Sequence, residues 1–170
     1  MVSFLICSHK APPSLDDTLA SLSRQTRAVP FEVLLINNGF AATEEQRLVK
    51  LAATLGLAEH FQIHREPIPG LGFARKCGFQ RARGEWLVML DDDNTVDPDF
   101  LSNLQRSCAK YPNLGGITPC VSPVWERTPP EWLVEFGASC LSYNLTSTFR
   151  PRRNASPANR SMPRKPLPKR

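Results

Sequence analysis

Residues 86–93 read Trp86-Leu-Val-Met-Leu-Asp-Asp-Asp93, an apolar run that leads directly into three carboxylates. Five apolar residues in a row are typical of a strand that is buried on both faces of a parallel sheet. Adjacent carboxylates repel one another, and no basic residue follows them before Arg106. We therefore expect a buried strand over Trp86–Leu90 with negative charge gathered at its carboxyl end.

Three more apolar runs precede this one, and a segment with helical features separates each run from the next. The predicted strands are Val2–Cys7, Phe31–Ile36 and Phe61–His64, with a further one over Ile117–Val121. Helical spacing predicts helices over residues 14–25, 43–55, 73–83 and 97–110, with capping patterns at Ser14, Thr43 and Asp97. This alternation predicts an α/β domain with a Rossmann-like, mostly parallel sheet flanked by helices.

Ligands of such sheets bind beyond the carboxyl ends of the strands, so the residues that follow the predicted strands are candidates for function. Asp91, Asp92 and Asp93 offer the hard oxygen ligands that Mg²⁺ or Mn²⁺ prefers, and a cation would relieve their repulsion. If strand geometry continues, Asp91 and Asp93 point to the same side. The alternative is a solvated acidic loop that leads into the next helix.

Two further segments each have a functional and a structural interpretation. Asn37-Asn38-Gly39 forms a tight turn, or Asn37 places its amide against the edge of a nucleobase. The segment Gly70–Lys76 is a flexible loop, or its helix start and basic groups meet a diphosphate. Its glycines match neither the dinucleotide-binding fingerprint nor the phosphate-binding loop, and the chain has no serine-hydrolase elbow.

The composition predicts one domain followed by an unstructured tail. The chain has 170 residues, of which 41% are hydrophobic, and this is enough for one core. Residues 150–170 hold eight of the 21 Lys and Arg residues, no acid and five prolines, so residues 1–149 carry 13 basic and 16 acidic groups. We expect an ordered domain over 1–149 and a disordered tail over 150–170. The tail is either an arm for anionic partners or an abnormal chain end, and its lack of aromatic residues argues against nucleic acid.

Cysteine usage and the lack of an export signal predict a cytoplasmic protein. The five cysteines are odd in number and include no C-x-x-C pair, which argues against a disulfide framework and against a zinc site. The apolar run near the N-terminus is too short for a signal peptide, and no run is long enough to span a bilayer.

Taken in order, these segments resemble the family 2 glycosyltransferases, whose nucleotide-sugar-binding half has the GT-A fold. The resemblance covers about residues 1–135. It rests on Val2–Ser8, Ser21-Leu-Ser-Arg-Gln25, Phe31–Gly39, Gly70-Leu-Gly-Phe-Ala-Arg75 with Gly78, and Ala82–Asp93.

The resemblance implies a site for a nucleotide-diphospho-sugar donor. Ser8 would line the nucleotide pocket, Asn37 stands where the family usually has a base-contacting aspartate, and Arg75 matches a basic residue beside the diphosphate. Asp91 and Asp93 match the D-x-D motif and would hold Mg²⁺ or Mn²⁺, with Asp91 and Asp92 on the ribose or around the metal. The metal would act as a Lewis acid that stabilises the departing nucleoside diphosphate.

The implied activity is transfer of a sugar to an acceptor that the sequence does not identify, whether a glycan, a lipid-linked acceptor or a small molecule. No catalytic base is recognisable, because Glu126, Glu131 and Glu135 are the only acids after Asp99 and none lies in a known motif. We therefore expect a C-terminally truncated glycosyltransferase, with peripheral contact to the cytoplasmic face of a membrane left open. The alternative is an inactive nucleotide-sugar-binding module.

Overall fold

The computed structural model describes residues 1–25, 29–119, 121–122, 124–125 and 127–132. The chain divides into two compact units, Met1–Leu114 and Gly115–Arg170, and each is considered by itself. In the second unit, no strand is present at the four described residues of Ile117–Val121, so that strand prediction is wrong there. The domain boundary predicted at residue 149 lies outside the described residues and stays a prediction.

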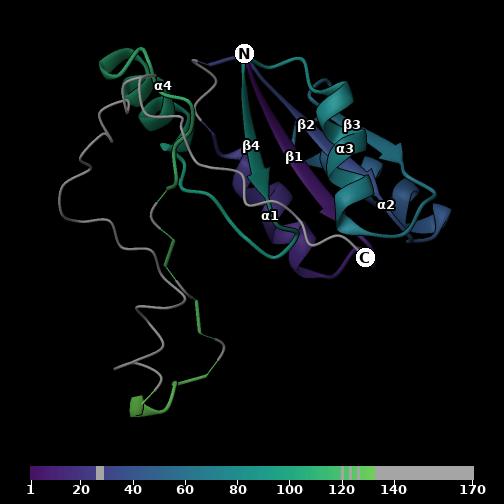
Figure 1. The fold of residues 1–170 in the computed structure, drawn as a ribbon. Helices are drawn as coiled ribbons and strands as arrows, with labels where there is room; N and C mark the ends of the chain where they lie inside the picture. Colours follow the sequence, from purple (N-terminus) through teal and green to yellow (C-terminus); the bar gives the residue numbers. More distant parts are fainter. Residues whose placement is uncertain (26–28, 120, 123, 126, 133–170) are drawn as a thin grey trace, which may run out of the picture. The chain divides into compact units, whose positions relative to one another are not determined.

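Four parallel strands form the sheet of the first unit, in the order β3-β2-β1-β4 (Figure 1). The central strands β1 and β2 are buried along almost their whole length, because their sequences are apolar on both faces. The predicted parallel α/β architecture is thereby confirmed. The strands are β1 (Val2–Ser8), β2 (Phe31–Asn37), β3 (Phe61–Arg65) and β4 (Trp86–Leu90).

Helices cover both faces of this sheet, and alternate strand residues supply the two cores. One face packs against α1 (Ser14–Ser23), α2 (Ala42–Thr54) and α4 (Phe100–Lys110), and the other packs against α3 (Leu71–Arg81). No helix in the described part of the chain is both long and apolar enough to cross a bilayer. The larger core includes Phe4, Ile6, Leu15, Leu19, Val33, Leu35, Leu48 and Leu101, and the smaller one includes Leu5, Leu34, Ile36, Ala74 and Cys77.

A glycine lets α3 approach the sheet closely. A Cβ atom on Gly78 would lie well inside van der Waals contact with the side chain of Leu5, which is 2% exposed. Ala74, one turn before Gly78, and Cys77, directly before it, are also buried in this contact. The position of α3 over β1 therefore depends on the missing side chain at residue 78.

We expect Gly78→Ala to lower the free energy of unfolding by about 1–3 kcal/mol, because the added methyl group overpacks a closed core. Gly72→Ala is the matched control on the same helix, since a Cβ there meets nothing within 4 Å. The control should be neutral or slightly stabilising. Urea unfolding of both variants measures the difference, and equal midpoints would contradict the close packing.

A polar cluster joins the amino ends of the strands on the α3 face. The carboxylate of Glu32, in a side chain that is 3% exposed, accepts hydrogen bonds from the Ser3 hydroxyl (2.6 Å) and the Arg83 backbone N–H (2.7 Å). The Arg83 guanidinium forms an ion pair with the same carboxylate at 2.7 Å. Ser3 Oγ also accepts from the backbone N–H of Gly84 at 2.8 Å. The segment before β4 is thus anchored to the two central strands.

The predicted helix caps are wrong. Ser14 is already helical and its hydroxyl donates to the backbone carbonyl of Asp92 (3.1 Å), while α2 begins at Ala42 with no side-chain cap. Helix α4 begins at Phe100 rather than after Asp97, whose carbonyl accepts from the Gln25 amide at 2.6 Å. For Ser14, a contact with a residue distant in sequence therefore takes up the hydroxyl that the local pattern assigned to a helix end.

Candidate functional site

The carboxyl ends of the four strands gather most of the predicted site residues at one edge of the sheet. Asn37 at the end of β2 pairs in register with Ser8 on β1 and with Arg65 on β3. Strand β4 ends at Leu90, opposite Ile6, and leads into the aspartates on the other side of β1. Ser8, Asn37 and the aspartates therefore belong to the same edge, as predicted from the strand pattern.

Ser8 and Asp92 are in direct contact. Ser8 is 2% exposed, and its hydroxyl donates a hydrogen bond to Oδ2 of Asp92 while it accepts one from the backbone N–H of Ala11 at 3.0 Å. Together with the bond from Ser14 to the Asp92 carbonyl, this contact fixes residues Asp91–Asp93, which we call the aspartate loop, to β1 and to the start of α1. The local sequence gives no sign of this contact, because 84 residues separate the two side chains.

Asp91 and Asp93 are arranged differently from Asp92. Strand geometry does not continue through them, since the loop turns back with a hydrogen bond from the Asn94 N–H to the Asp91 carbonyl at 3.3 Å. Both residues are exposed, and neither carboxylate has a hydrogen-bond or ion-pair partner among the described residues. The turn thus leaves two carboxylates free while the middle one is held by the protein.

The free carboxylates fit the donor chemistry of a divalent cation. Carboxylate oxygens are the ligands that Mg²⁺ and Mn²⁺ prefer. The described residues include no cluster of three or more His, Cys, Asp or Glu side chains arranged to hold a metal. A cation bound by Asp91 and Asp93 would therefore need further oxygen ligands, which a diphosphate and water can supply.

Arg75 and Asp91 line a small hollow of about 10 Å³ between α3 and the ends of β1 and β4, which we call the Arg75–Asp91 groove. Burial raises the pKa of the Cys7 thiol on this groove to about 11, with Arg75 acting to lower it and the neighbouring aspartates to raise it. The thiol is therefore neutral near pH 7 and is not an activated nucleophile. The rest of the lining is apolar: Leu5, Leu71, Met89 and Leu90.

A larger cleft of about 290 Å³, which we call the β2–β3 cleft, lies at the ends of β2 and β3. The side chain of Arg65 at its edge is 61% exposed. The ring of His9 packs against Gly39, where a Cβ atom would overlap it, and His9 Nδ1 lies 2.8 Å from the Asn38 carbonyl oxygen. The lining residues are His9, Asn37, Asn38, Gly39, Phe40, Ala42, Arg65, Glu66, Pro67 and Pro69.

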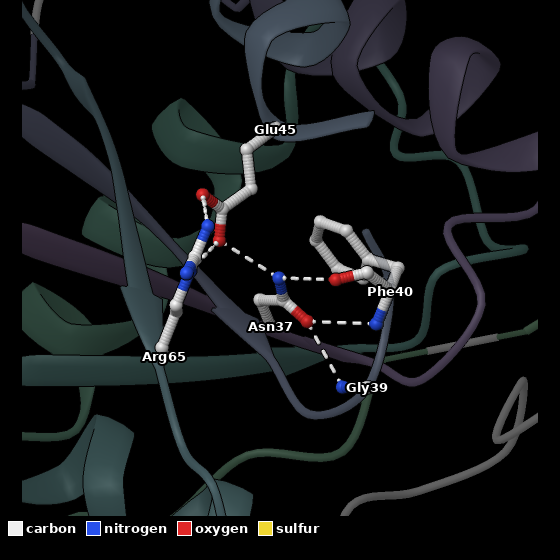
Figure 2. A network of polar contacts seen from close by, with 5 residues as sticks. All are labelled: Asn37, Gly39, Phe40, Glu45 and Arg65. Atoms are coloured by element: carbon white, nitrogen blue, oxygen red, sulfur yellow. Dashed lines mark hydrogen bonds and ion pairs between the residues drawn. The ribbon is translucent and has the colours of Figure 1, made fainter. Parts of the chain in front are cut away.

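The side chain of Asn37 is fully engaged within the protein (Figure 2). Its Oδ1 accepts from the backbone N–H groups of Gly39 and Phe40, both at 2.9 Å. Its Nδ2 donates to the Phe40 carbonyl (2.9 Å) and to Oε1 of Glu45 (2.7 Å). Arg65 donates two hydrogen bonds of 2.6 Å to the Glu45 carboxylate, and these bonds, together with the one from Asn37, hold the pKa of Glu45 below its usual value.

The structure adds residues that sequence reasoning missed. Asn38, Glu45, Arg65 and Glu66 belong to the β2–β3 cleft or to the network behind it, although none was singled out. One signal was available for Asn38, which follows Asn37 directly and so faces the opposite side of the sheet. Glu45 offered no such signal, because its position on α2 looks like an ordinary acidic first turn.

The parallel sheet with helices on both faces matches the GT-A architecture of the solved glycosyltransferase structures to which the chain is similar. The chain matches the description "Glycosyl transferase family 2" over residues 3–169, and it belongs to this family.

The relatives and solved structures agree on the fold. The glucosyl-dolichyl phosphate glucuronosyltransferase of Haloferax volcanii is 24% identical over 137 residues, which are 79% of this chain. The putative glycosyltransferase EpsH of Bacillus subtilis is 26% identical over 113 residues, or 66% of this chain. Among solved structures, S. aureus TarS 1-349 with UDP-GlcNAc superposes with a TM-score of 0.56 at 17% identity over 69% of this chain. The mannosyltransferase PcManGT of Pyrobaculum calidifontis with GDP-Man and Mn²⁺ gives a TM-score of 0.57 at 19% identity over 72%.

The chain spans less than half of the proteins that it resembles. It covers 42% of the H. volcanii enzyme, 32% of EpsH, 37% of the TarS chain and 35% of the PcManGT chain.

Proposed function

We propose that this chain binds a nucleotide-diphospho-sugar at the carboxyl edge of its sheet and takes part in transfer of the sugar to an acceptor. The observation that carries the proposal is the aspartate loop: Ser8 binds Asp92, while Asp91 and Asp93 have no partner among the described residues, and Asp91 lines the same groove as Arg75. Family membership and the donors named for the two solved structures, UDP-GlcNAc and GDP-Man, support the same conclusion.

In this proposal, each group at the edge has a defined task. Asp91 and Asp93 would hold Mg²⁺ or Mn²⁺, which supplies Lewis-acid stabilisation of the charge on the departing diphosphate. Arg75 would bind the diphosphate oxygens, and Ser8 with Asp92 would form the wall against the ribose. Asn37 would line the β2–β3 cleft beside the base, where direct contact with the base requires exchange of one of its present hydrogen bonds.

Arg75→Ala should weaken binding of UDP or GDP in the presence of Mn²⁺ by roughly tenfold, because the diphosphate loses a charged hydrogen-bond donor. Lys76→Ala removes the same charge from an exposed neighbour that does not line the Arg75–Asp91 groove, and it should have a smaller effect. Isothermal titration calorimetry measures both affinities. Equal losses of nucleotide affinity in the two variants would show that Arg75 acts only through its positive charge and does not bind the diphosphate directly.

A second candidate function is a binding module without turnover. The acids after Asp99 favour it, because none of Glu126, Glu131 and Glu135 lies in a recognisable catalytic motif. Glu131 belongs to the second unit, and Glu126 and Glu135 lie outside the described residues. Release of UDP or GDP from a nucleotide-sugar, measured with Mn²⁺ and a panel of glycan and lipid-linked acceptors, separates the two functions. Binding of the nucleotide-sugar without release of UDP or GDP identifies the module. The cytoplasmic location and the contact with a membrane surface stay predictions.

A further inference from the structure

Asn38 connects the end of β2 to a loop that is distant in sequence. The side chain is 7% exposed. Its Nδ2 donates to the backbone carbonyls of Glu66 (2.9 Å) and Ile68 (2.8 Å), and its Oδ1 accepts from the backbone N–H of Gly70 (2.8 Å). One amide therefore holds the whole segment 66–70, which lies between β3 and α3.

Gly70 is the residue from which α3 begins. Its φ of 131° lies where an L side chain is strained, and its carbonyl accepts hydrogen bonds from the N–H groups of Phe73 and Ala74, both at 3.1 Å. Arg75 is the fifth residue of α3 and begins its second turn. The body of α3 is fixed by its contact with the sheet at Gly78, whereas the start of α3 is fixed through Asn38.

We infer that Asn38 is a positioning residue that sets the place of segment 66–70 and, through Gly70, of Arg75 at the Arg75–Asp91 groove. This inference rests on the proposed function, because Arg75 matters only if the groove holds a diphosphate. Asn38 has no donor left for a ligand, since both amide hydrogens are donated to carbonyls of segment 66–70, and its Oδ1 already accepts the Gly70 N–H. It acts by holding the chain.

The position requires an amide rather than a carboxylate. An ionised aspartate keeps the acceptor for the Gly70 N–H but has no hydrogen to donate, so it would face two carbonyl oxygens as a repelling charge. Asn37 and Asn38 point to opposite faces of the sheet, with Asn37 bonded to α2 through Glu45 and Asn38 bonded to the segment that enters α3. The consecutive asparagines thus attach one strand end to the helical layers on both faces.

The test compares Asn38→Ala and the isosteric Asn38→Asp with Asn103→Asp, which adds the same charge on the exposed face of α4. Affinities for UDP and GDP with Mn²⁺ should fall on the order of tenfold in both Asn38 variants and stay unchanged in the control. Hydrogen exchange in the ligand-free protein should show loss of protection at the Gly70 amide in Asn38→Ala and retention of it in Asn38→Asp.

A double-mutant cycle with Arg75→Ala separates positioning from general destabilisation. If Asn38 acts through Arg75, Asn38→Ala should cost little further affinity once Arg75 is gone. Fully additive losses, or wild-type affinity in both Asn38 variants, would overturn the inference. If the unaltered chain binds neither nucleotide, the proposed function fails, and exchange at the Gly70 amide still decides whether Asn38 holds the segment.

Discussion

Asp93→Ala should remove the effect of Mn²⁺ on nucleoside diphosphate binding, with a loss of affinity on the order of 100-fold, or about 2.7 kcal/mol. The exposed carboxylates of Asp91 and Asp93 are the only two of the aspartate loop that the described residues leave unpaired, because Asp92 is bonded to Ser8. With one of them gone, a cation has a single protein ligand, and the diphosphate meets the remaining negative charge with little compensation. Titration of UDP and GDP with and without Mn²⁺ measures the change.

Glu59→Ala is the matched control for this experiment. Glu59 is exposed and precedes the amino end of β3, so its removal changes the net charge equally while the carboxyl edge stays intact. Its affinity for the nucleotides should equal that of the unaltered chain. An Asp93→Ala variant that binds UDP and GDP as tightly as this control, with the same Mn²⁺ dependence, would rule out a metal site at the aspartates.

Glu32→Ala should lower the free energy of unfolding by about 3 kcal/mol, the largest effect on stability that we expect from a single substitution in this chain. The substitution removes the shared acceptor of the Ser3 hydroxyl and the Arg83 N–H, and it leaves the Arg83 guanidinium without its partner. Glu85→Ala serves as the control, because this nearby residue is exposed. Urea unfolding at pH 7 compares the two variants, and equal midpoints would contradict the prediction.

The same cluster predicts how stability depends on pH. Burial acts to raise the pKa of Glu32, but the hydrogen bonds from Ser3 and Arg83 outweigh it, so the pKa lies below its usual value. In the acid range the unfolded chain therefore binds more protons than the folded one. The contribution of Glu32 is complete above the ordinary carboxyl pKa and is lost as the pH falls through the lowered value. Glu32→Gln should flatten this part of the stability curve.

The strands and the sheet edge were predictable because their signals are local. Apolar runs such as Phe31–Ile36 identify strands buried on both faces, and the helices between them require parallel pairing. Parallel strands place all their carboxyl ends together, so Ser8, Asn37 and the aspartates had to share one edge. The apolar runs and the helical spacing between them were therefore sufficient to predict the four strands of the sheet and the edge at which the candidate site lies.

The hydrogen-bond partners were not predictable, because they depend on residues far apart in the sequence. The local pattern predicts a helix cap at Ser14, whereas the Ser14 hydroxyl contacts the backbone of Asp92, 78 residues later. One hydrogen bond of the Asn37 side chain goes to Glu45 on α2. Those of the Asn38 side chain go to segment 66–70, about 30 residues further along the chain. Local patterns identify the type of each polar group, but tertiary packing decides where its bonds go.

The Glu32 cluster lies at the amino ends of the strands, opposite the edge where the ligand groups gather. Substitutions at the carboxyl edge can therefore accumulate during evolution without disturbing the contacts that join β1, β2 and the segment before β4. The contacts that join the strands and the groups proposed to bind ligand therefore lie at opposite ends of the same strands.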